Sequence, residues 1–152
     1  MEFFGAARQA RRDDKELGKG IWRRTHDRFK RGLDRYHQVL EGVADDALYD
    51  QLVGIANELS AQLTQVRGCC MRAQQLRPSD GLDIPGGKLA AVHRSLSKAG
   101  NSLAAAAESA AMARLAASPE ASQDAAESVR RRAAIVVDDV TEALRLLEGD
   151  EA

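Results

Sequence analysis

Apolar residues recur at alternating spacings of four and three along most of this chain, and this periodicity limits what it can fold into. In the first such segment the recurring positions are Trp22, His26, Phe29, Leu33, Tyr36, Leu40 and Val43. This spacing places side chains along one face of an α-helix. Only His26 interrupts the apolar stripe, so the segment predicts an amphipathic helix with one polar residue on its buried face.

Three further segments repeat the pattern, and turn-forming residues separate them. Residues 78–87 are rich in Pro, Gly, Ser and Asp and predict a loop, whose Leu82 and Ile84 we expect to plug one end of the core. Ser118-Pro119 predicts a helix start, with a capping hydroxyl before a proline at the first helical position. The expected helices cover about 21–43, 46–77, 88–117 and 119–148.

The lengths and connections of these segments predict the fold class. A chain of 152 residues suits one domain, and short joints force consecutive helices to run antiparallel. We expect an all-α protein, an antiparallel up-down-up-down four-helix bundle over residues 21–148. A long helical hairpin that completes its core by dimerising is the alternative. In the segment 88–117 the stripe consists of alanine after Leu103. This predicts that the neighbouring helices approach closely there.

Residues 1–20 are expected to form a loosely ordered, flexible N-terminal arm. Traced backward, the first stripe falls on lysines and arginines, and Gly18 and Gly20 interrupt it. An alternative is a short amphipathic anchor for a membrane or a partner, with Phe3 and Phe4 on its apolar side.

Composition places the protein among cytoplasmic chains without a membrane span. The 22 basic and 23 acidic residues nearly balance, the start lacks the pattern of a secretory signal, and no stretch approaches 18 apolar residues. Cys69 and Cys70 are adjacent, diverge on a helix, and are expected to be reduced, buried thiols. Residues 149–152 form an acidic tail.

No motif indicates catalysis or a bound metal. The chain lacks a glycine-rich phosphate loop, a nucleophile elbow and a His-Glu-x-x-His motif. In the expected bundle, His26, His37 and His93 stand at three heights roughly 16 Å apart, whereas a zinc–nitrogen bond is about 2 Å. We therefore expect a protein that is not an enzyme and has no cofactor.

His26 is the most informative single residue, because a buried polar group requires a partner. Counting outward from the joint between the first two helices places Gln62 at the same height. The prediction is a buried polar layer of His26 and Gln62. It serves either to fix the helix register or to orient a ligand in a small cavity.

Arg24, Arg28, Arg31 and Arg35 recur at helical spacing on the outer side of the first helix. We call these four residues the basic stripe. A solvated face is the simplest interpretation, and a protein-docking surface is the next. Nucleic-acid binding has less support, since Asp27 interrupts the stripe and no aromatic side chain accompanies it outward.

Three short stretches resemble segments of small helical proteins from high-GC actinobacteria. They are WRRTHDRF at 22–29, PSDGLD at 78–83 and AGNSL at 99–103. The resemblance extends over residues 20–148 and agrees with a helical fold. It implies no activity, and no functional residue is carried over from it.

Three functional hypotheses follow. The preferred one is a non-catalytic helical module that binds a protein partner or a second copy of itself. The second is a binder of a small ligand or metal that uses the core near His26. The third is weak nucleic-acid association through the basic stripe.

Overall fold

The computed structural model describes residues 2–149 of the chain, with side chains from residue 4 onward. This part is all-helical, as expected, and contains no strand. The five helices are α1 (Glu2–Leu17), α2 (Ile21–Glu41), α3 (Asp46–Leu76), α4 (Lys88–Leu115) and α5 (Pro119–Glu148). The four expected helices correspond to α2–α5, and each ends within two residues of its predicted boundary.

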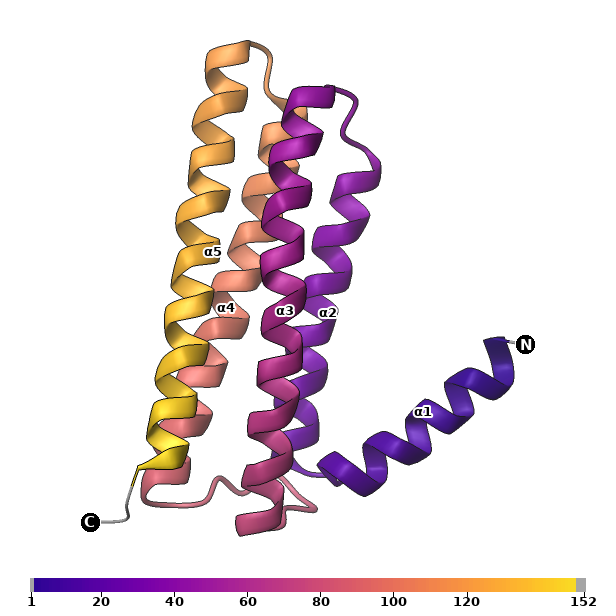
Figure 1. Cartoon of the computed structure of the whole chain (residues 1–152), viewed down its shortest axis with the longest axis vertical. Helices are drawn as coiled ribbons and strands as arrows, with labels where there is room; N and C mark the ends of the chain where they lie inside the picture. The colour runs from indigo at the N-terminus through magenta and orange to yellow at the C-terminus, as the bar shows by residue number, and fades with distance from the viewer. Residues whose placement is uncertain (1, 150–152) are drawn as a thin grey trace.

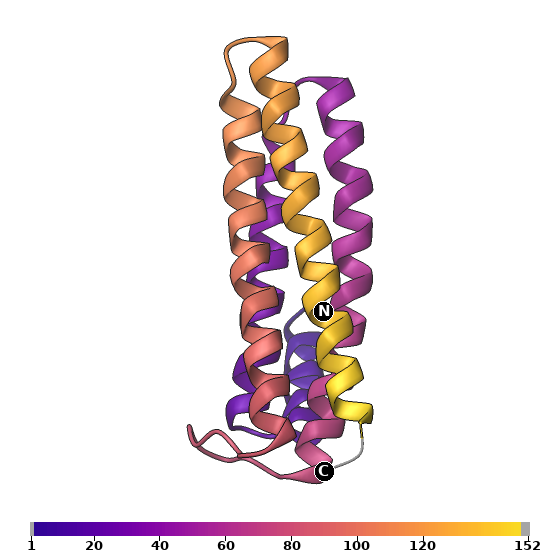
Figure 2. The ribbon, with the colours of Figure 1, turned by 90° about the vertical axis from the view of Figure 1, so that its left-hand side faces the viewer.

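The helices α2–α5 lie side by side, and consecutive helices run in opposite directions (Figure 1). Helix α2 packs against α3 and α4, and α5 packs against the same two helices from the other side. The contact between α4 and α5 is the most extensive of all. The view turned by 90° shows these two helices side by side and nearest at the end where the short turn joins them (Figure 2).

Small side chains allow this close approach of α4 and α5. The fully buried alanines of α4 are Ala99, Ala106, Ala107 and Ala110, and alanine lets helix axes come near the lower end of the usual 8 to 10 Å range. A hydroxyl adds a specific contact, since Ser95 Oγ donates to the Asp139 carbonyl oxygen at 2.7 Å. The stripe alanines Ala106 and Ala110, which follow Leu103, are thus buried, as predicted.

Side chains cap two helix starts, and the cap at Ser118 is the predicted one. The Ser118 side chain accepts a hydrogen bond from the Ala121 amide at 3.1 Å, with Pro119 at the first helical position. Asp45 Oδ1 accepts from the Leu48 amide at 3.0 Å. These contacts satisfy amide groups that have no partner inside the helix, and they fix where α5 and α3 begin.

Residues 2–17 are a helix, so the expectation of four helices with a loosely ordered arm is wrong in this segment. Leu17 is fully buried, although we placed residues 1–20 outside the core. Gly18 ends α1 with a positive φ of 74°, a conformation that glycine adopts without strain. The chain bends at Gly18, so the apolar stripe of α2 does not continue into α1 (Figure 1). Of the expected acidic tail, only Gly149 is within the described residues.

The loop between α3 and α4 is fastened at Ser79. The buried Ser79 hydroxyl accepts a hydrogen bond from the Ile21 amide at 3.1 Å, and Gln74 Oε1 accepts from the Ser79 amide at 2.9 Å. The expectation that Leu82 and Ile84 plug the core is wrong, because they are 64% and 55% exposed. Ser79 fixes the loop against the start of α2 and leaves both apolar side chains outside the core.

Candidate functional site

His26 is buried on α2, as expected, but its partner differs from the predicted one. Its Nδ1 lies 2.9 Å from Oδ1 of Asp27, and because a carboxylate only accepts, the Nδ1–H donates. Gln62 is half-exposed on α3, and no hydrogen bond joins it to His26 within the described residues. The predicted His26–Gln62 layer is therefore wrong. The Nδ1–H of the imidazole instead bonds to the carboxylate of the next residue in the chain.

Asp27 extends this contact into a group of charges that joins three helices. Its Oδ2 accepts a hydrogen bond from Arg23 Nε at 2.9 Å. Arg23 Nη1 in turn donates to Asp14 Oδ1 on α1 at 2.7 Å. The start of α2 is thus connected by charge to the end of α1.

Arg67 completes the group from α3. Its Nη2 lies 2.8 Å from Oδ1 of Asp13 and 2.8 Å from Oε2 of Glu16. We call the whole group the α1 ion-pair cluster; its members are Asp13, Asp14, Glu16, Arg23, Asp27 and Arg67. Together with Leu17, the cluster holds the end of α1 against α2 and α3.

The cluster favours the charged forms of its carboxyl groups. Burial alone would raise the pKa of Asp13, but hydrogen bonds from Arg67 and Gln9 and the charges of Arg67 and Arg23 together lower it. The hydrogen bond from Arg67 is the main cause that lowers the pKa of Glu16. The ionised carboxylates are therefore the forms that hold α1 in place.

All four arginines of the basic stripe are exposed on α2. They do not act as one surface, however. Arg28 donates a hydrogen bond to Asn101 Oδ1 on α4, and both Arg24 and Arg28 line a pocket between α2 and α4. On the same helix, Lys30 pairs with Asp34 at 2.9 Å. The N-terminal half of the stripe thus belongs to the groove toward α4.

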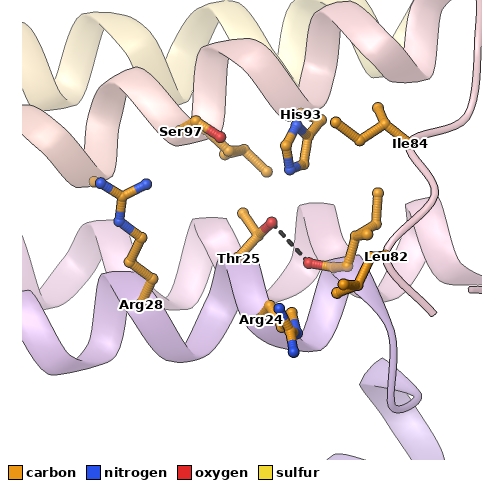
Figure 3. Close-up of a pocket in the computed structure, with 10 residues that line it drawn as sticks. Arg24, Thr25, Arg28, Leu82, Ile84, His93 and Ser97 are labelled. Carbon is orange, nitrogen blue, oxygen red and sulfur yellow. Dashed lines mark hydrogen bonds between the residues drawn. The ribbon is translucent and has the colours of Figure 1, made fainter. Parts of the chain in front are cut away.

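This α2–α4 pocket has a volume of about 250 Å³, and the loop after α3 contributes Leu82 and Ile84 to its lining. Arg28 reaches from α2 across to α4, and His93 points from α4 toward α2 (Figure 3). Leu82 and Ile84 extend from the loop beside His93 (Figure 3). The pocket therefore combines basic, polar and apolar walls from three separate segments.

The two cysteines are buried, unbridged thiols, as expected. Burial raises the pKa of Cys69 to about 12 and raises that of Cys70 well above its usual range. A thiol reacts as a nucleophile or binds a metal through its thiolate. Their position thus gives these cysteines a packing role.

Among the residues that the structure describes, no group of three or more His, Cys, Asp or Glu side chains is arranged to hold a metal ion. The same stretch of chain has no helix that is both long and apolar enough to span a bilayer.

Sequence analysis missed the α1 ion-pair cluster and the α2–α4 pocket. The cluster joins Asp13 and Glu16 to Arg67, more than 50 residues away, and only the Arg23–Asp27 pair at i, i+4 was visible in the sequence. The pocket requires the loop conformation that Ser79 sets. Comparison with protein-family models, with curated proteins and with solved structures finds no match for this chain.

Proposed function

We propose that this protein is a non-catalytic interaction module that self-associates through α1. In this proposal α2–α5 form an antiparallel four-helix bundle in a cytoplasmic protein, and α1 is the docking helix. The observation that carries it is the position of α1, which projects from the side of the bundle and touches it only at its C-terminal end (Figure 1).

The projecting half of α1 has two small apolar side chains, Ala10 and Ala6, on the side that Leu17 faces, and we call these two the apolar face of α1. Leu17 is fully buried, whereas Ala10 and Ala6, seven and eleven residues earlier, are exposed. The ion-paired Asp13 and Asp14 lie between them and Leu17. A helix of 16 residues is marginal in water without tertiary packing. A partner that covers this face would stabilise the projecting half of α1.

Charge distribution favours a second copy of the chain as that partner. Residues 1–35 carry a net charge of +5 and the remainder carries −6. Helix α1 itself has four basic and four acidic residues. Three of its acids, Asp13, Asp14 and Glu16, are ion-paired at the end that contacts the bundle, whereas Arg8 and Arg11 are exposed on the projecting half. The projecting half of one copy would therefore be attracted to the acidic remainder of another. Electrostatic attraction would then orient α1, and burial of its apolar face would supply the affinity.

Native mass spectrometry and light scattering of the full chain test this proposal. We expect a dimer or a larger assembly at micromolar concentration. Ala10→Lys, which adds a charge to the apolar face of α1, should shift the mass toward the monomer. Gly5→Lys adds the same charge on the other side, where a side chain meets nothing within 4 Å, and should leave the assembly intact.

Two outcomes would overturn the proposal. One is a monomer mass that does not change with concentration in the unmodified chain. The other is an equal effect of Ala10→Lys and Gly5→Lys, which would make charge alone the cause.

The other two hypotheses have less support. His26 is buried, its Nδ1–H is bonded to Asp27, and within the described residues no group of three or more His, Cys, Asp or Glu side chains is arranged to hold a metal with it. Carboxylates lie along the basic stripe, since Asp27 is paired with Arg23 and Asp34 is paired with Lys30. Both contacts reduce what this face can offer to a run of phosphates.

A further inference from the structure

The α2–α4 pocket has a basic wall without a compensating acid. Arg24 and Arg28 line it, and no carboxylate is among its lining residues. The Arg24 side chain has no hydrogen bond or ion pair with any residue in the described range, while Arg28 is held toward α4 by Asn101. A guanidinium with all its donors available is suited to bind an anion.

Polar groups inside the pocket are also available. The Ser97 hydroxyl and the His93 ring form no hydrogen bond with the described part of the chain. Thr25 uses its hydroxyl proton for the Ile21 carbonyl oxygen at 2.8 Å, which leaves its oxygen free to accept. Burial lowers the pKa of His93, so the neutral ring offers one donor and one acceptor nitrogen. The ring is also positioned edge-on to Trp22, with 6.0 Å between centroids.

The opposite wall is apolar and open to solvent. Leu82 and Ile84 line the mouth although more than half of each side chain is exposed, and Leu96 is buried behind them. Large apolar side chains exposed together beside a cavity indicate a binding surface. A drug-sized ligand needs about 300 Å³ or more, so a pocket of about 250 Å³ suits a smaller molecule.

We propose that the α2–α4 pocket binds a small organic carboxylate with a short hydrocarbon chain. The carboxylate contacts Arg28 on the side of Ser97, Thr25 lies beside it, Arg24 adds a second positive charge at the edge of the pocket, and the chain packs against Leu82 and Ile84. The pocket shares no residue with the exposed apolar face of α1, so this proposal and self-association can fail separately.

The test is a titration of the full-length protein followed by backbone amide NMR, with sodium hexanoate as the probe. Acetate keeps the charge without the chain, and 1-hexanol keeps the chain without the charge. We expect saturable shifts at Thr25, His93 and Ser97 with hexanoate. Acetate and hexanol should each bind at least tenfold more weakly.

Variants locate the site. Arg24→Gln combined with Arg28→Gln should weaken hexanoate binding about tenfold to a hundredfold, as expected for the loss of hydrogen bonds to a charged group. Arg31→Gln removes the same charge from the same helix outside the pocket and should change nothing. Leu82→Ser alters an exposed side chain, so folding is preserved, and should weaken hexanoate but not acetate.

Three results would overturn the proposal. The first is the absence of saturable shifts with hexanoate. The second is binding of acetate or hexanol as tight as that of hexanoate. The third is hexanoate affinity that survives the arginine changes or falls equally in Arg31→Gln. If the double arginine variant does not fold, which its spectrum would reveal, the test rests on Leu82→Ser. Unchanged hexanoate affinity in that variant would then overturn the proposal.

Discussion

Arg67 on α3 holds Asp13 on α1, with 2.8 Å between Nη2 of the arginine and Oδ1 of the carboxylate. The side chains are only 22% and 13% exposed, so solvent screens this pair less than it screens the pair of Lys30 and Asp34, which are 52% and 60% exposed. Beside the buried Leu17, this contact sets the position from which α1 projects.

A double-mutant cycle of Asp13→Asn and Arg67→Gln should give a coupling energy of about 1 kcal/mol, at the upper end for ion pairs that retain some exposure. Urea unfolding of the two single variants and the double variant measures it. The cycle of Lys30→Gln and Asp34→Asn, a more exposed pair, is the control and should give a smaller value. Equal coupling energies would show that Asp13–Arg67 is an ordinary surface pair.

Acid should release α1 before it unfolds the rest of the protein. The pKa of Asp13 is lowered from its ordinary 3.8, so its contribution is complete above that pH and is lost as the pH falls through the lower folded value. Carboxyl NMR titration should give a midpoint below 3.8 for Asp13. Arg67→Gln should raise this midpoint toward 3.8. A midpoint at or above 3.8 in the unmodified protein would contradict the ion-pair contact.

The sequence predicted α2–α5 well because each has a continuous apolar stripe and a marked boundary. Ser118 and Pro119 fixed the start of α5 within one residue. Helix α1 was missed because Gly18 bends the chain, so the stripe of α2 could not be traced back into it. Counted back from Leu17 at helical spacing, Ala10 and Ala6 fall on the same side of α1.

Candidate sites were predicted less well, because they depend on contacts between distant segments. Gln62 was predicted as the partner of His26 because counting from the joint placed both at the same height. The imidazole instead bonds to Asp27, the next residue in the chain. No periodicity indicates which of two acceptors a buried donor will use. The α2–α4 pocket depends on Ser79, whose hydroxyl binds the Ile21 amide 58 residues away.

Gly20 should tolerate no side chain. A Cβ at this position would overlap the oxygen atoms of Ser79, which fastens the loop to α2. Gly20→Ala should lower the free energy of unfolding by about 1–3 kcal/mol, the usual cost of overpacking. Gly5→Ala, where the added carbon meets nothing within 4 Å, is the control and should be neutral or slightly stabilising. Thermal or urea unfolding decides between these outcomes, and equal stability of the two variants would show that the Ser79 contact is easily rearranged.

Cys69 and Cys70 should resist alkylation in the folded protein. Both are fully buried, and with the pKa of Cys69 at about 12 almost no thiolate exists at pH 8. Iodoacetamide at pH 8 should therefore leave the native chain unmodified over an hour, whereas addition of urea should give two adducts by mass spectrometry. The rate in urea is the control for reagent activity.

Because alkylation of a buried thiol requires the chain to open, the native rate also reports opening of α3. Fast modification without urea would show that α3 separates from its neighbours in the native state, in conflict with its packed position between α2 and α5.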